Sequence, residues 1–263
     1  MAGLQNCNLV ANPCFSKPIV TETDAQPCFD APLYRRIIGS LQYLTLTRPD
    51  IAYAVNVLSQ HMHDPAPQHT LMLKKLIRYI KGSTELGIPI TRSNLQLRTF
   101  SDADWASDPV TWKSTSGYCT FMGNTLVSWT VKKQSTVSRS STESEYRALA
   151  AATADTIWIR RLLLDFRITL SNPVDIFCDN MSTIALANNS IFHARTKHIE
   201  IDQRFVRDHI QQKHIKLLPV STIDQLADIL TKPLSTNRFK VLRSKLTVST
   251  YSSVCGGMLE QIT

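Results

Sequence analysis

The sequence lacks several features that would place it in a membrane-bound or secreted class of protein. Its 263 residues contain no uninterrupted apolar run of the ~18 residues that a membrane-spanning helix needs. The first ten residues, MAGLQNCNLV, have no basic segment followed by an apolar one, so they do not form a secretory signal. No internal repeat or low-complexity tract is present. These absences favour an intracellular protein without a membrane partner.

The cysteines lack the spacing of a zinc site or a disulfide framework. Six cysteines are scattered along the chain, and no two of them form a Cys-x-x-Cys pair. The histidine pairs His193/His198 and His209/His214 have no partner cysteines, so a surface or core role is favoured over zinc binding. We therefore expect reduced thiols, in keeping with an intracellular location.

The composition indicates a folded, basic protein. Hydrophobic residues make up 43% of the chain and charged residues 19%, which is typical of a globular protein and not of a disordered one. The formal net charge is +8 and the isoelectric point is near 9.3. A basic chain favours a polyanionic partner such as nucleic acid, although many basic proteins bind none.

Apolar periodicity divides the chain into segments of different kinds. Residues 1–33 show no periodicity and are expected to form an extended lead-in. Between residues 34 and 92, apolar residues recur at helical spacing in three segments that prolines separate, which predicts a small helical segment. The small-residue stretch 247–263 is expected to be a flexible tail.

Residues 93–246 predict an α/β domain. Short strand-like runs between Leu97 and Trp129 are followed by a long helical pattern, with Gly123-Asn124 as a hairpin turn inside the first part. The later elements are a strand at 174–178, helices at 181–188 and 199–211, a strand at 215–220, and helices at 224–231 and 238–246. This order predicts a mixed five-stranded sheet with helices packed on it.

Acidic residues occur in separated motifs, each near the expected end of a strand or start of a helix. The motifs are SDADWASD, STESEYRAL, IFCDN and DQLADIL, which contribute Asp102, Glu145, Asp179 and Asp228. Carboxylates at the carboxyl ends of neighbouring strands meet in one crevice of an α/β sheet. Carboxylate oxygens are the ligands that Mg²⁺ prefers, and a pair of such ions clamps both oxygens of a phosphodiester displacement. The motifs therefore favour a two-metal nuclease.

The first two motifs also have structural explanations. Asp102 or its neighbour Asp104 is suited to a turn after a strand. Either Glu143 or Glu145 is suited to a capping box at the start of the long helix, with Ser140 or Thr142 as N-cap.

The same holds for the last two motifs. Asp179 could cap the following helix, and Asp228 could pair with Lys232 one helical turn later. Taken one at a time, each structural explanation is favoured. The occurrence of all the motifs in one chain favours the metal site instead.

Basic and hydroxyl side chains precede the long helix and are suited to phosphate contacts at its N-terminus. An ordinary exposed loop explains them equally well. The candidate nucleic-acid-binding residues are Lys132, Lys133, Arg139, Ser140 and Asn180.

Long stretches of the chain resemble the C-terminal part of the Pol polyprotein of copia-type LTR retrotransposons, especially plant ones. The stretches YRRIIGSLQYLTLTRPDIAYAVNVLSQHMHDP and LIRYIKGS are similar to the thumb and connection at the end of the reverse-transcriptase region. Four further stretches are similar to the ribonuclease H domain of the family, namely SDADWASDPVTWKSTSGYCTFMGNTLVSWTVKKQSTVSRSSTESEYRALA, CDNMSTIALANN, ARTKHIEIDQRFVRDHI and STIDQLADILTKPL. The resemblance implies a C-terminal fragment with a thumb remnant at 34–92 and a ribonuclease H-like domain at 93–246.

The resemblance also implies an activity, hydrolysis of the RNA strand of an RNA–DNA hybrid with two Mg²⁺ ions, or Mn²⁺ in their place. The family's Asp-Glu-Asp-Asp set falls by motif on Asp102, Glu145, Asp179 and Asp228, with Asp104 and Glu143 as competitors. The implied partners are the hybrid and the upstream reverse-transcriptase region. The implied location is a cytoplasmic virus-like particle or the nucleus.

Departures from the family pattern leave alternatives open. The polymerase motif Tyr-x-Asp-Asp does not occur, so we expect no DNA synthesis, and the loop before Asp228 lacks the histidine of cellular ribonucleases H. The main alternative is a catalytically silent, nucleic-acid-binding relic of a truncated element. An integrase-like nuclease is disfavoured because the zinc-binding His/Cys motif and the long acidic spacing are missing.

Overall fold

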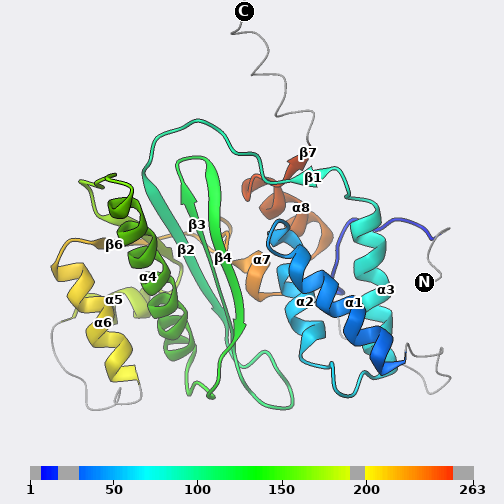
Figure 1. Cartoon of the computed structure of the whole chain (residues 1–263). Helices are drawn as coiled ribbons and strands as arrows, with labels where there is room; N and C mark the ends of the chain where they lie inside the picture. Colours follow the sequence, from blue (N-terminus) through cyan, green and yellow to red (C-terminus); the bar gives the residue numbers. More distant parts are fainter. Residues whose placement is uncertain (1–6, 17–29, 190–198, 251–263) are drawn as a thin grey trace, which may run out of the picture. The chain divides into compact units, whose positions relative to one another are not determined.

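The computed structural model describes residues 7–16, 30–189 and 199–250, which form two compact units (Figure 1). The first unit contains the described residues up to Ile90 together with those from Lys232 onward, and the second is Thr91–Thr231. Much of the expected lead-in and tail, and the pair His193/His198, lie outside the described residues.

The second unit is built on one mixed sheet, whose strands are β2 (Leu97–Asp104), β3 (Thr115–Met122), β4 (Thr125–Lys133), β5 (Val174–Cys178) and β6 (Ile215–Pro219). The strand order is β4-β3-β2-β5-β6. Strands β2, β3 and β4 pair antiparallel, whereas β5 pairs parallel with β2 and β6 pairs parallel with β5. The prediction of an α/β fold with a mixed five-stranded sheet is therefore confirmed.

The predicted hairpin turn joins β3 to β4. Gly123 has a positive φ of 59°, a backbone conformation that residues with a Cβ rarely adopt. A Cβ at this position would also lie 2.0 Å from the Ser93 hydroxyl oxygen. Both observations explain why glycine occupies the turn.

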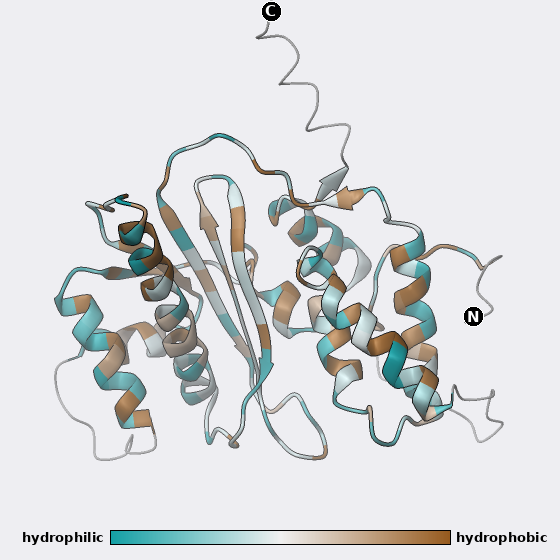
Figure 2. Cartoon of the chain, viewed as in Figure 1, coloured by the Kyte–Doolittle hydropathy of each residue, from teal (hydrophilic) through white to brown (hydrophobic). Residues whose placement is uncertain are grey.

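The helices of the second unit are α4 (Ser141–Asp165), α5 (Met181–Asn188), α6 (Glu200–Gln211) and the short α7 (Asp228–Thr231). Buried apolar residues of α4 pack on the sheet, and Figure 2 shows that hydrophobic and hydrophilic residues alternate along this helix. Tyr146 and Leu149 of α4 are fully buried in one core with Ile176 of β5 and Val206 of α6. This packing fixes the start of α4 relative to the end of β5.

Helix α7 is shorter than the predicted helix at 224–231. Before Asp228 the chain makes turns whose backbone N–H groups bond to side chains. The Asp224 N–H donates to the Ser221 hydroxyl, and the Ala227 N–H donates to the Gln225 side chain. Because these local bonds compete with helical ones, the helix begins only at Asp228.

The first unit is helical, as predicted. It contains α1 (Ala31–Leu44), a single 3₁₀ turn (Pro49–Ile51), α2 (Ala52–Ser59), α3 (Pro67–Lys81) and α8 (Thr236–Lys245). A two-stranded sheet pairs β1 (Leu86–Gly87) with β7 (Ser249–Thr250). None of the described helices is long and apolar enough to cross a membrane.

The second unit ends earlier than the expected domain boundary at 246. Helix α8 belongs to the first unit because it packs on Tyr79 of α3. The Phe239 ring meets the Tyr79 ring edge-on with centroids 5.5 Å apart. An Arg243 guanidinium nitrogen also donates to the Tyr79 hydroxyl at 3.2 Å. The chain therefore returns to its first helices after the sheet domain.

Candidate active site

The register of two neighbouring strands determines the positions of two of the predicted acids. Phe100 of β2 pairs with Phe177 of the parallel strand β5, and their rings stack at 4.8 Å. Asp102 and Asp179 each lie two residues beyond this pair, so they emerge on the same face of strands that are ~4.8 Å apart. The structure thus brings Asp102 and Asp179 to the carboxyl-terminal ends of two neighbouring inner strands of the sheet.

The start of α4 separates the roles of Glu143 and Glu145. Ser140 is the N-cap, and its hydroxyl accepts the Glu143 N–H at 3.2 Å. The Glu143 carboxylate accepts the Arg139 N–H at 2.9 Å and pairs with Arg147 at 2.8 Å. Glu143 is therefore occupied in closing the helix end, as a capping residue does. Glu145 contributes to neither of these capping bonds.

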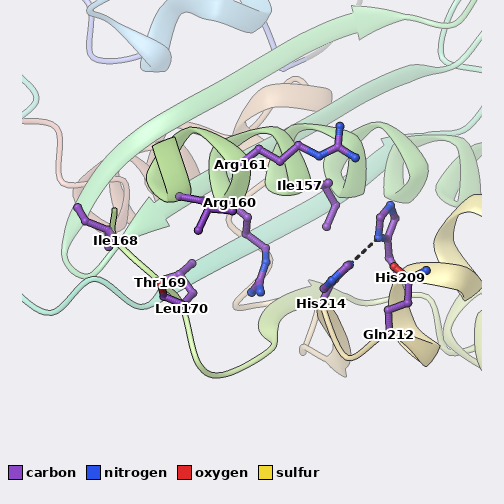
Figure 3. Close-up of a pocket in the computed structure, with 10 residues that line it drawn as sticks. Ile157, Arg160, Arg161, Ile168, Thr169, Leu170, His209, Gln212 and His214 are labelled. Carbon is purple, nitrogen blue, oxygen red and sulfur yellow. Dashed lines mark hydrogen bonds between the residues drawn. The ribbon is translucent and has the colours of Figure 1, made fainter. Parts of the chain in front are cut away.

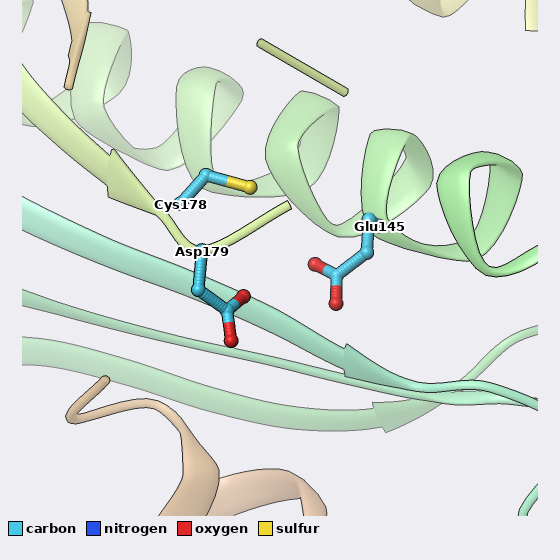
Figure 4. Close-up of side chains that lie close together, drawn as sticks. All are labelled: Glu145, Cys178 and Asp179. Carbon is cyan, nitrogen blue, oxygen red and sulfur yellow. The ribbon is translucent and has the colours of Figure 1, made fainter. Parts of the chain in front are cut away.

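Glu145 lies instead beside the end of β5. A carboxylate oxygen of Glu145, the Cys178 sulfur and a carboxylate oxygen of Asp179 all lie within 4.8 Å of one another (Figure 4). Burial raises the pKa of the Cys178 thiol, and the negative charges of Glu145, Asp179 and Asp102 raise it further. Three carboxylates from three elements therefore act on the same small region.

This donor set fits a divalent cation. Glu145 and Asp179 offer oxygen ligands at close range, and a bound cation would relieve the repulsion between their charges. The cluster contains neither Asp102 nor Asp228. The thiol of Cys178 is a poor ligand for Mg²⁺, which prefers oxygen.

Helix α7 positions Asp228. It is the first residue of this helix and is 5% exposed. The Thr231 hydroxyl at the other end of α7 donates to the Asp102 carboxylate. A Cβ added to Gly117, the residue that pairs with Asp102, would lie 2.7 Å from Thr231 and 2.8 Å from Leu230. Only glycine therefore lets α7 approach the sheet this closely.

Asp104, the competitor of Asp102, is the last residue of β2. It lies on the same face as Asp102 because side chains alternate along a strand. Its exposure is intermediate, whereas Asp102 is fully buried. The buried position next to α7 distinguishes Asp102.

The predicted nucleic-acid-binding residues have different surroundings. Lys133 forms an ion pair with Asp108. Burial would raise the pKa of Asp108, but hydrogen bonds from Lys133 and from backbone N–H groups hold it well below its usual range. Ser140 and Asn180 cap α4 and α5, so their side chains already accept backbone N–H groups. Lys132 and Arg139 are exposed, which leaves them accessible to a ligand.

Sequence reasoning missed the residues that hold the acidic segments in place. The buried Gln225 donates from its side chain to the Ser101 carbonyl at 3.0 Å, which attaches the segment before α7 to β2. Thr222 donates to the Asp179 carboxylate at 3.4 Å. Gln225 lies within the acidic motif DQLAD, and this position was the signal in the sequence that could have identified it.

A second set of missed residues holds the segment between β4 and α4. The buried Gln134 side chain donates to the Ser116 hydroxyl and the Ser144 carbonyl, each at 2.9 Å. Its oxygen accepts the Ser138 hydroxyl, and the Trp105 ring N–H donates to the Ser138 carbonyl. These bonds connect the SDADW motif to the start of the helix that carries Glu145.

Comparison with known proteins shows relatives along nearly the whole chain. The retrovirus-related Pol polyprotein from transposon RE2 of Arabidopsis thaliana is 45% identical over 251 residues, which cover 95% of this chain and 17% of the relative. The polyprotein from transposon TNT 1-94 of Nicotiana tabacum is 36% identical over 211 residues, which cover 80% of this chain and 16% of that protein. The chain thus spans about a sixth of the length of these relatives.

Among solved structures, a ribonuclease H1 isolated from compost is similar to 52% of this chain. The match covers 93% of that chain, with 14% identity and a TM-score of 0.41. No protein-family model matches the sequence. The identity to the plant polyproteins confirms the resemblance seen in the motifs. The chain is a homologue of one part of the retrovirus-related Pol polyproteins of copia-type retrotransposons.

Proposed function

We propose that this chain is a ribonuclease H that hydrolyses the RNA strand of RNA–DNA hybrids during retrotransposon reverse transcription. The observation that carries the proposal is the meeting of Glu145 and Asp179 beside Cys178, within reach of the Asp102 charge. Similarity to Pol polyproteins supports it, because reverse transcription produces hybrids whose RNA must be removed.

The proposed ligands of two Mg²⁺ ions, or of Mn²⁺ in their place, are Asp102, Glu145, Asp179 and Asp228. Bound metal would supply an activated water and stabilise the leaving oxygen. Glu145 and Asp179 hold their oxygens within 4.8 Å, close enough to share a cation. Asp102 is oriented by the Thr231 hydroxyl, which fixes its carboxylate before any ligand arrives. Asp228 is the first residue of α7, and Thr231 at the other end of this helix donates to the Asp102 carboxylate.

The exposed Lys132 and Arg139 are proposed to contact the hybrid backbone near the start of α4. Their positive charges suit phosphates, and phosphate contacts position a nucleic acid without reading its sequence. The proposed partners are the hybrid and the upstream reverse-transcriptase region of the polyprotein.

A catalytically silent relic is the second candidate. Its support is the formal net charge of +8, which suits a polyanionic partner whether or not the chain cleaves it. The two candidates differ in one property, which is metal-dependent cleavage.

The test compares Asp179→Asn with Asp175→Asn, a matched change on the same strand. Asp179→Asn removes a cluster carboxylate, so we expect RNA cleavage to fall at least about 100-fold, with hybrid binding in EDTA changed little. Asp175 lies on β5 outside the cluster, so its variant should cleave at nearly the original rate. Undiminished cleavage by the Asp179 variant would overturn the site.

A further inference from the structure

A cavity of about 250 Å³ lies on the second unit, away from the acidic cluster. It is lined by the C-terminal half of α4, the segment before β5, and the residues at and after the end of α6 (Figure 3). At ~1.5 Å rise per residue, α4 separates Arg160 in this cavity from Glu145 by about 22 Å. The cavity is therefore distinct from the candidate active site.

The charged groups of this cavity are two arginines. Arg160 and Arg161 line it together with His209 and His214, and no carboxylate does. Neither arginine forms an ion pair with a carboxylate among the described residues. Arg160 donates to the Asn172 carbonyl at 3.2 Å, and burial lowers the pKa of its guanidinium. Two guanidinium groups thus share a concave surface without a counter-charge in its lining.

The surroundings of His209 show the same excess of positive charge. Burial lowers the pKa of His209, and His214, Arg161 and Arg160 lower it further. The exposed Asp208 is the acid that opposes them, and the Phe205 ring meets His209 edge-on. More cations than anions therefore act on this histidine.

The two histidines are joined in a way that allows one added proton. Their Nδ1 atoms lie 3.0 Å apart in a hydrogen bond, so one nitrogen carries the proton and the other accepts it. The pair can exist with both rings neutral or with one ring protonated. A second added proton would place donors on both sides and break the bond.

We propose that this cavity, hereafter the cationic pocket, binds an oxyanion, namely a phosphate group carried by inorganic phosphate or by a nucleotide. Arginine forms paired hydrogen bonds with phosphate, and both Arg160 and Arg161 line the pocket, although Figure 3 shows their side chains running in different directions. The volume is below the roughly 300–1,000 Å³ of drug-sized ligand sites, which suits a small anion or the phosphate end of a larger ligand. This inference does not depend on the proposed nuclease activity.

The test uses the full chain and sulfate as the first probe, because sulfate stays a dianion across neutral pH. Sulfate should shift the imidazole NMR signals of His209 and His214, which line the pocket. Arg161→Gln should weaken binding at least about tenfold, since a hydrogen bond to a charged group contributes ~1.5–3 kcal/mol. Arg204→Gln, an exposed change on α6 outside the pocket, is the matched control and should bind normally.

Inorganic phosphate and a nucleoside monophosphate then distinguish the sources. Equal affinities would mean that the cationic pocket recognises the oxyanion alone, whereas tighter binding of the nucleotide, lost in the Arg161 variant, would assign a nucleotide. Absence of binding in the millimolar range, or equal binding by both arginine variants, would overturn the proposal.

Discussion

At the scale of single residues, the start of α4 carries two glutamates with different surroundings. Glu143 accepts a backbone N–H and pairs with Arg147, whereas Glu145 points toward the end of β5. Two positions along a helix turn a side chain by about 200°, so adjacent acidic residues of one motif face different environments. The sequence alone left both glutamates as candidates.

The different surroundings of Glu143 and Glu145 predict different effects of their substitution on RNA cleavage. Glu145→Gln should lower RNA cleavage at least about 100-fold, because a metal ligand loses its charge. Glu143→Gln keeps an oxygen that can accept the Arg139 N–H, so its cleavage rate should stay within a few-fold of the original. Cleavage rates at saturating Mg²⁺ measure both, and a larger loss in the Glu143 variant would exchange the two assignments.

His69 provides a prediction about pH. Its Nδ1 atom accepts the Ala66 N–H at 3.0 Å at the start of α3, and its ring stacks on His61 with centroids 3.7 Å apart. The pKa of His69 is lowered from 6.5 to about 4, mainly by burial and in part by His61, while Asp64 opposes this. Protonation would turn the accepting nitrogen into a donor and break the bond to Ala66.

The free energy of unfolding should therefore fall as the pH falls from 6.5 to 4. In this range the unfolded chain binds a proton at His69 that the folded chain excludes, whereas above it both states are neutral. Urea unfolding at several pH values measures the effect. His69→Gln keeps an accepting oxygen without the titration, so it should flatten this part of the curve, and an unchanged slope would contradict the account.

At the scale of elements, the first unit is joined by a buried polar network. Arg48 pairs with Asp50 at 2.7 Å, and their side chains are 6% and 0% exposed. Arg48 also donates to the carbonyl and hydroxyl of Ser83, each at 2.8 Å. The Tyr79 hydroxyl donates to Asp50 at 2.6 Å. The network links the 3₁₀ turn after α1 to the end of α3.

Removing one charge of this network should be costly. Asp50→Asn leaves the Arg48 guanidinium buried without a counter-charge, which predicts a loss of about 3–5 kcal/mol in unfolding free energy. Asp30→Asn is the matched control, because Asp30 is exposed and makes no side-chain cap bond to α1. Denaturant unfolding compares the two, and equal stabilities would show that the pair contributes little.

At the scale of the whole molecule, periodicity was sufficient to predict most elements of the sheet domain. Strand β5 and helix α5 coincide with their predicted bounds because Val174–Cys178 is a short apolar run and Asn180 caps the next helix. The strand order was not predicted, because it depends on long-range pairing such as Phe100 with Phe177. The strand propensity of single residues does not determine which strands pair.

Side chains that form hydrogen bonds between distant segments were not predicted from the sequence. Tyr79 lies in a segment that was predicted to be helical from its apolar periodicity, and its hydroxyl forms hydrogen bonds with Asp50 and Arg243. This second role explains why α8 joins the first unit instead of the sheet domain. The acids of the candidate site were identified by their motifs, whereas Gln225 and Thr231 became visible only once the chain was folded.

The most direct test of the central claim is the fate of each strand of an end-labelled RNA–DNA hybrid incubated with the purified chain. We predict cleavage of the RNA strand alone, in the presence of Mg²⁺ and not of EDTA. A folded chain that binds the hybrid and cuts neither strand with Mg²⁺ or Mn²⁺ would contradict the account and favour the silent relic.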